Sequence, residues 1–539
     1  MMNSRFHGLL ALSAAILFAQ FATAAPPTIR AASGESRSST APVLLKTTTV
    51  VAHGFTATPI TPWFENMAKA ILARAGGVGA VYRYDGVNGR LVRVENDGGD
   101  GSDLNIVIAF GWEGDSEFVG EGPNWGYVQA AGDAMSAMLR DAAYETPGAG
   151  PSDLVSNRAV HLIGHSRGGC LVSEAAKRLA IAGIPVDQVT TLDPHPANGT
   201  LDAPYNIDWG DPYPRHWSST IWQDNVWRAD GGGIFNGVDQ DGIPVEGVHN
   251  TQLSESLLAL GGYVLGHFDV HLWYHGTIDL SPNPDNGEVS ISNLMRATWW
   301  PEGYDVVGFN RSAIGGGERP EIPPGIEPDP ASAPLLENGH FEAGSRAGWD
   351  YHGGVGANVI GGGSAWFARL DASRPELVHN RMHVPTPPPG FCLRISFDAR
   401  RASSDATDDT LKIELERWED EAPVALPCAA WSVASLPSEF ARYSVMVPAE
   451  FMCRTVRLHA EVNFSAAVES TVDLTNFAVD YVLEGDLDGD GIVGGADLSG
   501  MLAAWGTLGD CLADLDGDGT VGGLDLGKLL ANFGLTTPN

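Results

Sequence analysis

The sequence predicts a multidomain protein with a parallel β-sheet covered by helices on both faces, then a β-sandwich, then a small α-helical module that contains a duplicated calcium loop. Three observations predict this order. Apolar strand-like runs alternate with helical patterns over 43–314, short period-two runs dominate 335–483, and an acidic motif occurs twice in 484–539. Alternating strands and helices are typical of parallel sheets, whereas period-two runs joined by turns are typical of antiparallel sandwiches. Residues 315–334, rich in proline and glycine, are the expected linker.

The charge of the chain limits the classes of partner. The 539 residues carry a formal net charge of -35 at pH 7. A protein this acidic repels phosphate backbones and anionic lipid surfaces. We therefore expect neither nucleic acid nor an anionic membrane as a primary partner. The acidity by itself names no substrate.

The N-terminal residues predict export. Arg5 precedes an apolar run over 9–21, and the small residues Ala22, Thr23 and Ala24 follow it. This is the pattern of a secretory signal peptide over residues 1–24, so we expect a secreted protein; an uncleaved membrane anchor is the alternative. Residues 25–42 are polar and predict a flexible leader.

The first domain is organised around a glycine-flanked serine. Gly164-His165-Ser166-Arg167-Gly168 lies between a buried strand-like run and a helical pattern that includes Leu171 and Leu179. Glycine on both sides relieves backbone crowding in a tight strand-to-helix turn, and the turn exposes the serine hydroxyl near the positive end of a helix. Ser166 is therefore the predicted nucleophile; the alternative is a passive serine in a glycine-rich turn. Further strands are expected at 44–52, 105–110 and 188–192, and helices at 63–72 and 125–143.

A nucleophilic serine needs a base, and the base needs an orienting carboxylate. Asp193 follows the strand at 188–192, the right place for that acid. The rival acids are Asp202, Asp208, Asp211, Asp224 and Asp269. The candidate bases are His195, His216, His249, His267, His271 and His275.

Three motifs together resemble the pancreatic-type lipase family of the α/β-hydrolase superfamily over about residues 44–280. They are the turn at Ser166, the run from Trp112 to Ser116 with Gly126-Tyr127 after it, and Thr191-Leu192-Asp193-Pro194. The resemblance implies that the base lies seven residues before Tyr274, which gives His267, with His271 second. It also implies an oxyanion hole made by the backbone N–H groups of Phe55 and Arg167.

This resemblance implies a carboxylic ester hydrolase that acts through an acyl-enzyme and needs no catalytic cofactor. The family's disulfide-framed lid and lipid-binding domain are missing, and Cys170 is the one cysteine in this domain. The substrate class stays open among a lipid, a small ester and an acylated polysaccharide. Two other hypotheses are kept: an amidase or peptidase with the same triad, and a non-catalytic, calcium-stabilised surface or polysaccharide-binding protein with a degenerate hydrolase domain.

The start of the sandwich carries a second resemblance. Residues 338–344, followed by Gly348-Trp349, resemble the start of carbohydrate-binding jelly-roll modules. The alternative is a spacer sandwich with Trp349 in its core. Cys392, Cys428 and Cys453 allow one disulfide in an exported protein, with its connectivity undetermined.

Two acidic loops, offset by 28 residues, close the chain. The predicted ligands of the first are Asp486, Asp488, Asp490, Asp497 and the carbonyl of Ile492; those of the second are Asp514, Asp516, Asp518, Asp525 and the carbonyl of Thr520. Oxygen ligands at this spacing suit calcium, so we expect two ions. A duplicated loop and helix resembles the type I dockerin module, which implies a cohesin-like or cell-surface partner. Loop positions 10 and 11, which read the partner in that family, hold Gly495-Ala496 and Gly523-Leu524, so the partner stays open.

Overall fold

The computed structural model describes residues 45–536 except 56–61, 87, 113–126, 147, 199–208, 229–233, 236–237, 240, 342–346, 350–357, 363–364, 404–407, 420–421, 448–450, 465–469, 507–512 and 517–519. The predicted signal peptide and leader lie outside these residues. Within the described part of the chain, no helix combines the length and the apolar character that a membrane crossing requires.

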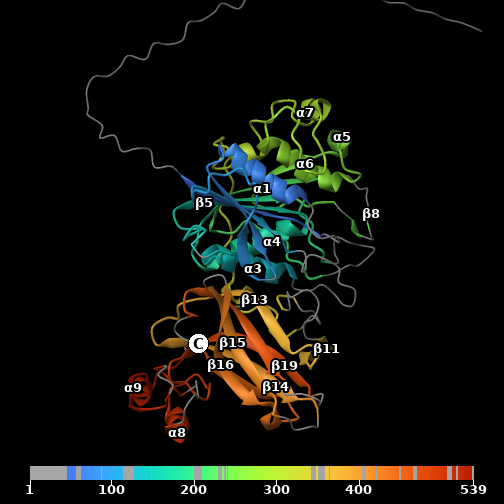
Figure 1. Cartoon of the computed structure of the whole chain (residues 1–539). Helices are drawn as coiled ribbons and strands as arrows, with labels where there is room; N and C mark the ends of the chain where they lie inside the picture. Colours follow the sequence, from blue (N-terminus) through green and yellow to red (C-terminus); the bar gives the residue numbers. More distant parts are fainter. Residues whose placement is uncertain are drawn as a thin grey trace, which may run out of the picture. The chain divides into compact units, whose positions relative to one another are not determined.

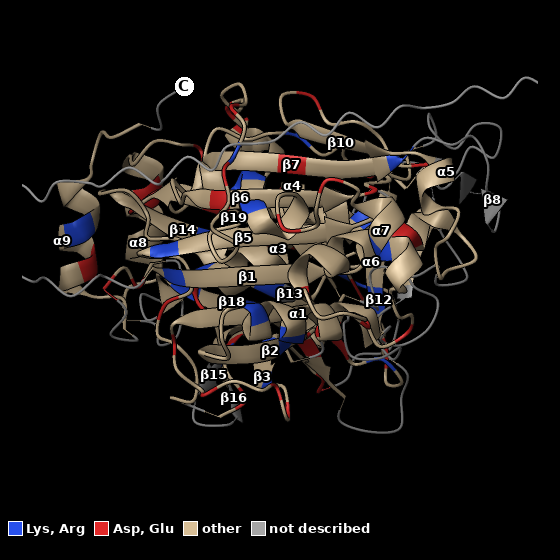
Figure 2. Cartoon of the chain, turned by 90° about the horizontal axis from the view of Figure 1, so that it is seen from above, with Lys and Arg blue, Asp and Glu red and all other residues tan. Residues whose placement is uncertain are grey.

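The first region is built on a mixed eight-stranded sheet in the order β10-β7-β6-β5-β1-β4-β2-β3. Neighbouring strands are parallel except β2 and β3, which are antiparallel. Figure 2 shows β7, β6, β5, β1 and β2 in this order across the sheet, with β4 between β1 and β2. The strands are β1 (Lys46–Ala52), β2 (Gly79–Asp85), β3 (Arg90–Arg93), β4 (Asn105–Phe110), β5 (Arg158–His165), β6 (Val186–Leu192), β7 (Thr220–Arg228) and β10 (His249–Leu253). The expected sheet is confirmed, with an antiparallel edge that the sequence did not predict.

Helices cover both faces of this sheet (Figure 1). Helices α1 (Pro62–Arg74) and α6 (Gly266–Ile278) pack on one face, and α3 (Tyr127–Arg140) and α4 (Arg167–Ile181) pack on the other. Successive strand residues point to opposite faces, so Val50 joins the core under α3 and α4 while Val51 joins the core under α1 and α6. The remaining short elements are α5 (Glu255–Leu258), α7 (Asn293–Trp299), the 3₁₀ helices η1 (Gly308–Arg311) and η2 (Pro330–Ser332), and the two-stranded pair β8 (Ile234–Phe235) and β9 (Val238–Asp239).

Strand β7, next to the edge strand β10, carries a polar run in its middle. Its Gln223, Asp224 and Asn225 are fully or almost fully buried. Asp224 Oδ1 accepts hydrogen bonds from Thr190 Oγ1 at 2.6 Å and Gln188 Nε2 at 3.1 Å. Burial raises the pKa of Asp224 to about 6, against the lowering effect of these two donors. The buried Asp224 and Asn225 of β7 are thus paired with side chains of β6.

The segment at 315–334, expected to be a linker, contacts the first region. Arg319 Nη2 lies 2.7 Å from Asp187 Oδ2, and Ile326 N donates to His216 O at 2.9 Å. Trp222 Nε1 donates to Pro320 O at 3.0 Å. Proline and glycine therefore mark an irregular segment here that is attached to the strands it follows.

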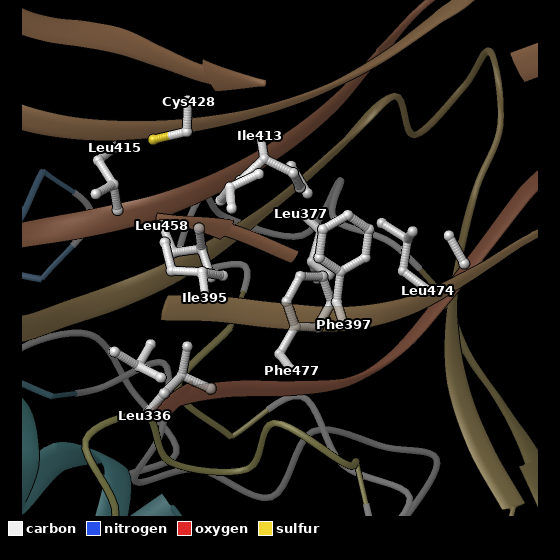
Figure 3. Close-up of a cluster of buried hydrophobic side chains, with 14 of the residues drawn as sticks. Leu336, Leu377, Ile395, Phe397, Ile413, Leu415, Cys428, Leu458, Leu474 and Phe477 are labelled. Carbon is white, nitrogen blue, oxygen red and sulfur yellow. The ribbon is translucent and has the colours of Figure 1, made fainter. Parts of the chain in front are cut away.

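The second region is an antiparallel β-sandwich, as predicted. One sheet has the order β11-β12-β19-β14-β17 and the other β13-β18-β15-β16. Its core includes Ile395, Phe397, Ile413, Leu458 and Phe477, whose side chains gather between the two sheets (Figure 3). The elements are β11 (Asn358–Gly362), β12 (Ala365–Leu370), β13 (Glu376–Val384), β14 (Phe391–Arg401), β15 (Thr410–Glu419), β16 (Ala422–Ser432), η3 (Val433–Ser435), β17 (Ala441–Met446), β18 (Arg454–Asn463) and β19 (Val472–Leu483).

The structure bears on two expectations for the sandwich: Trp349 in its core, and one disulfide among its cysteines. Trp349 is buried, with its indole Nε1 donating to Asn338 O at 3.0 Å, so it is a core residue. Cys392, Cys428 and Cys453 are free thiols, as is Cys170, so no disulfide links the cysteines that the structure describes. The disulfide that export made plausible is not formed here.

The third region has two short helices, α8 (Gly495–Ala503) and α9 (Gly523–Ala531). Met501 and Leu529 are fully buried in a small core with Val493 and Val521. Other apolar residues in and just after these helices lie outside this core. Leu502, Trp505, Leu530 and Phe533 are about half exposed, at 54, 47, 52 and 50%. A core this small leaves the module dependent on other stabilisation.

Candidate active site

Ser166 lies on a strained turn between β5 and α4. Its φ is 58°, a left-handed conformation that costs a non-glycine residue energy, and it is the N-cap of α4. A Cβ on Gly164 would lie 2.0 Å from Gly168 O, and one on Gly168 would lie 2.3 Å from His53 O. Glycine at both positions is therefore required for the turn to close, which explains the G-x-S-x-G pattern physically.

Asp193 and His267 form the predicted pair of acid and base. His267 Nδ1 lies 2.7 Å from Asp193 Oδ2. Asp193 directly follows β6 and is fully buried, and its Oδ1 accepts the backbone N–H of Arg228 at 2.8 Å. His267 is the second residue of α6 and is 4% exposed. The carboxylate thus fixes the imidazole with its Nδ1–H toward Asp193.

Ser166 is tied to the same edge of the sheet. Its backbone N donates to Leu192 O at 2.9 Å, one residue before Asp193, and its backbone O accepts from His195 N at 3.3 Å. The neighbouring His165 places Nε2 3.0 Å from His267 O. The chain therefore brings the three predicted residues to the carboxyl ends of β5 and β6, where parallel sheets place their sites.

The rival histidines have other contacts. His271 is fully buried and stacks on Trp63 with ring centroids 4.0 Å apart. Burial holds the pKa of His271 well below its usual range, and His165 and His267 nearby lower it further. The other candidates contact main-chain oxygens or an arginine (His195 with Asp241 O, His216 with Thr220 O, His249 with Arg311) or lie buried in α6 (His275).

The rival acids are also engaged elsewhere. Asp224 pairs with Thr190 in the sheet, and Asp269 accepts the backbone N–H groups of Gly262 and Tyr263. Asp211 pairs with Arg167, as described below. Asp202 and Asp208 lie outside the described residues.

The end of β1 passes directly beside the nucleophile. A Cβ on Gly54 would lie 2.4 Å from Ser166 Cβ and 3.0 Å from Ser166 Oγ. Trp112 holds this segment, because its Nε1 donates to His53 O at 2.7 Å and its backbone N donates to His53 Nε2 at 3.2 Å. Phe55, the residue after Gly54, and Arg167, the residue after Ser166, therefore belong to the two segments that meet at this close approach.

The side chain of Arg167 forms a buried ion pair that the sequence did not predict. Arg167 Nε lies 2.6 Å from Asp211 Oδ2, and Nη2 lies 2.7 Å from Oδ1, with both side chains almost fully buried. The guanidinium stacks between Trp112 and Trp209 at 5.6 and 4.7 Å, and Trp209 stacks on Phe55 at 5.9 Å. One stack therefore joins both predicted oxyanion residues. An arginine next to the nucleophile is the signal in the sequence for such a partner.

The first acidic loop gathers its carboxylates around one point. Oxygens of Asp486, Asp488 and Asp490 lie within 4.8 Å of one another. Asp497, in the first turn of α8, accepts N–H groups from Leu487, Asp488 and Gly494. Burial raises the pKa of Asp486, and the nearby Asp497 carboxylate adds to this rise. Ile492, whose carbonyl is a predicted ligand, lies between Asp490 and Asp497 in the chain.

The second loop repeats this arrangement. Oxygens of Asp514, Asp516 and Asp525 lie within 4.8 Å of one another, and Thr520 lies between Asp516 and Asp525 in the chain. Burial opposes the ionisation of Asp525, but backbone N–H groups of Asp516 and Gly522 outweigh it and lower its pKa. Asp518 lies outside the described residues. The hard, clustered oxygen donors of both loops fit calcium.

Comparisons with known proteins find no matching family model and no matching curated protein. Solved structures that the chain is similar to include a xylan-binding CBM22-2 domain of Xyn10C from Paenibacillus barcinonensis (TM-score 0.21, 16% identity, 26% of this chain and 96% of that one). Two others are a family 16 carbohydrate-binding module (TM-score 0.20, 12% identity, 27% of this chain and 99% of that one) and a CBM28 module specific for non-crystalline cellulose (TM-score 0.20, 14% identity, 26% of this chain and 92% of that one).

These comparisons correct the family assignments made from the motifs. The neighbours are β-sandwich carbohydrate-binding modules, and neither a lipase family model nor a dockerin family model matches the chain. The assignments to the pancreatic-type lipases and to the type I dockerins are therefore wrong. The cohesin-like partner was implied only by the dockerin resemblance and loses its support. The side-chain geometry around Ser166 is independent of both assignments.

Proposed function

We propose that this chain hydrolyses carboxylic esters with Ser166 as nucleophile, His267 as base and Asp193 as the orienting acid. The observation that carries the proposal is the 2.7 Å contact between His267 Nδ1 and Asp193 Oδ2 at the sheet edge where Ser166 occupies a left-handed turn. Ser166 is 7% exposed, and backbone strain of this kind is typical of a functional residue that the surrounding structure holds in place.

The proposed reaction has two acyl-transfer steps. With Nδ1–H donated to Asp193, His267 Nε2 carries the lone pair that takes the Ser166 proton while Oγ attacks the ester carbonyl carbon. The backbone N–H groups of Phe55 and Arg167 stabilise the oxyanion. His267 returns the proton to the leaving alcohol, an acyl-enzyme forms, and water deprotonated by His267 then releases the acid and restores Ser166.

The substrate class is the next question for this proposal. A lipid, a small ester and an acylated polysaccharide all present the same reacting carbonyl. The test is a panel of p-nitrophenyl esters of increasing acyl length, with matched p-nitroanilides, acetylated xylan and triolein. We expect ester turnover that is lost in Ser166→Ala. Faster cleavage of the anilides would move the proposal to an amidase or peptidase, and turnover by Ser166→Ala would overturn the triad.

A second proposal concerns the sandwich, which we infer binds polysaccharide. The outer face of its five-stranded sheet is rich in groups that exchange hydrogen bonds with hydroxyls. Asp398 pairs with Arg442 at 3.2 Å, Asp473 pairs with both Arg369 and Arg400, and Arg400 lies over the exposed Phe440 at 4.5 Å. Two of the similar structures are a xylan-binding domain and a module specific for non-crystalline cellulose.

The binding proposal is tested with Ser166→Ala full-length protein, so that no substrate is consumed. Affinity electrophoresis in gels with xylan or hydroxyethyl cellulose should retard this protein. The double variant Arg400→Ala and Phe440→Ala should migrate as it does without polysaccharide. The matched control is Arg401→Ala, on the same strand. Equal migration of all variants would leave the sandwich as a spacer.

We also propose that the two acidic loops each hold one calcium ion. Asp486, Asp488, Asp490, Asp497 and the Ile492 carbonyl would hold one, and Asp514, Asp516, Asp518, Asp525 and the Thr520 carbonyl the other. The support is the 4.8 Å grouping of carboxylate oxygens in each loop. Calcium neutralises these clustered charges and serves folding, not ester chemistry.

Export is retained as part of the proposed function. Its support is the apolar run at 9–21 followed by small residues up to Ala24. N-terminal sequencing of protein recovered from the medium of an expressing bacterial culture should begin at Ala25. Recovery only in the membrane fraction with an intact N-terminus would favour the anchor.

A further inference from the structure

A buried arginine lies directly against the carboxylate that orients the base. Arg228 is the last residue of β7 and is 4% exposed. Its Nε lies 3.1 Å from Asp193 Oδ2, the oxygen that also contacts His267 Nδ1, and its backbone N donates to Asp193 Oδ1 at 2.8 Å. One arginine therefore contacts both oxygens of Asp193.

Arg228 is held in place by groups around it. Its Nη1 lies 3.4 Å from Asp241 Oδ1. Gly242 packs against the triad acid so closely that a Cβ there would lie 2.2 Å from Asp193 Oδ1. A Cβ on Gly266, the residue before His267, would lie 3.6 Å from Arg228 Cδ, so the arginine stem packs against the start of α6. The guanidinium thus lies wedged between β6, the Asp241 segment and α6.

We infer that Arg228 is a positioning residue of the ester hydrolase proposed above: it shares the Asp193 carboxylate with His267 and keeps the imidazole unprotonated, and so usable as a base, further into acid. A carboxylate that orients a histidine also attracts a proton onto it. A guanidinium on the same oxygen offsets that attraction and repels an imidazolium, while leaving Asp193 ionised and aimed at Nδ1. This inference rests on the proposed function.

The other charged and titratable groups near His267 come from four elements. Asp193 follows β6, His165 ends β5 with its ring centroid 4.5 Å from that of His267, and Asp241 follows β9. On α6 itself are Asp269 and His271. Burial holds the pKa values of His165 and His271 well below their usual range, so both rings are neutral through the working pH range.

Asp269 is the remaining group that titrates near this range. Burial raises its pKa to about 6, while backbone N–H groups of Tyr263 and Gly262 and the charge of Arg228 act in the opposite direction. Its carboxylate contacts those two N–H groups. Because the charge of Arg228 also lowers the pKa of Asp269, replacing Arg228 moves this titration as well. The pH dependence is therefore measured in an Asp269→Asn background too, where a shift that follows the charge at residue 228 belongs to His267.

The test is the pH dependence of kcat/KM for p-nitrophenyl butyrate, from pH 4.5 to 9, for wild type, Arg228→Lys and Arg228→Gln. We expect the acid limb of Arg228→Gln to move up by about one pH unit, so that its rate at pH 5 relative to pH 8 falls about tenfold below the wild-type ratio. Arg228→Lys keeps the charge without the fork and should lie between the two. The matched control is Asp241→Asn, which removes the outer partner of Arg228 and should leave the limb within about 0.3 pH unit of wild type.

Two results would overturn the inference: an acid limb of Arg228→Gln at the wild-type position, or equal shifts in Arg228→Gln and Arg228→Lys, since the charge would then be irrelevant. If Arg228→Gln fails to fold by circular dichroism, Arg228→Met, which also removes the charge, decides, and an unmoved limb there overturns the inference. Labelling of Ser166 by a fluorophosphonate over the same pH range separates the two proposals. No labelling of wild type at any pH sinks the hydrolase and this inference together, whereas labelling with a limb that ignores residue 228 sinks this inference alone.

Discussion

Carboxylates have opposite surroundings in the first region of this chain, at Asp193, and in the third region, at the acidic loops. Asp193 is fully buried, and the protein itself supplies its donors: His267 Nδ1 and the backbone N–H and side chain of Arg228. Asp488 and Asp490 are exposed and lie within 4.8 Å of a third carboxylate. The fold itself pairs the Asp193 carboxylate, whereas the calcium ions proposed for the acidic loops would offset the repulsion among their carboxylates. The following variants and treatments test this difference.

The largest expected effect is the loss of the base. His267→Ala should lower kcat/KM for a soluble ester by about 10⁴-fold, because it removes the proton acceptor that Asp193 orients. His271→Phe should lower it by less than about tenfold, since phenylalanine can keep the stacking on Trp63. Steady-state rates of both variants, with circular dichroism as a check of folding, decide the ranking. The reverse order would assign the base to His271.

Calcium removal should affect one region only. On the full chain, EDTA should raise hydrogen–deuterium exchange in peptides from 485–535 to the level of unfolded chain, while the ester rate changes less than about twofold. Asp490→Ala should reproduce the first-loop part of this loss without EDTA, and Asp480→Ala on β19 is the matched control. A collapse of the ester rate with EDTA would mean that the sheet edge also depends on a cation.

The Arg167–Asp211 pair should matter to the rate more than to binding. Asp211→Asn leaves a buried guanidinium beside the oxyanion donors, so kcat should fall about 30-fold with KM changed less than about threefold. Initial rates on the same ester give both constants. Asp224→Asn, another buried carboxylate variant but remote from these donors, should keep kcat near wild type. Equal losses in the two variants would point to a general effect on folding.

The smallest effect is expected at Asp224, whose buried carboxylate accepts hydrogen bonds from Gln188 and Thr190. Burial raises its pKa from the usual value near 4 to about 6, so the folded state binds a proton that the unfolded state releases between these values. Its contribution to stability is therefore present below about pH 4 and is lost as pH rises to about 6. Asp224→Asn should raise Tm by about 3 °C at pH 8 and not at pH 4, by differential scanning calorimetry. An equal change at both values would exclude the linkage.

The sequence predicted the triad because chain order and local geometry are coupled there. Gly164 and Gly168 are required by the turn at Ser166, and Asp193 follows the next strand, so both could be read from short motifs. The same physics explains the wrong family assignment. A turn that tolerates only glycine beside Ser166, and an acidic loop with alternating Asp, are demanded by local chemistry and do not require a shared family.

What the sequence could not predict depends on contacts between distant residues. The polar run Gln223-Asp224-Asn225 does not resemble a buried strand in the sequence. Asp224 and Asn225 can be buried because their hydrogen-bond partners Gln188, Thr190 and Thr191 lie on β6. Arg228 and Asp211 join the site only through that tertiary arrangement. The expected helix faces in the third region were apolar in pattern, yet Trp505 and Phe533 are half exposed, since hydropathy alone does not specify which apolar face is covered.

The most direct test of the central claim is the activation of Ser166. Wild-type protein is incubated with a fluorophosphonate at pH 8, and the labelled peptide is identified by mass spectrometry. We predict a single covalent adduct on Ser166, and labelling rates at least about 10³-fold slower in His267→Ala and Asp193→Asn, because the hydroxyl then lacks an oriented base. Labelling of wild type that spares Ser166, or proceeds equally fast in His267→Ala, would contradict the account.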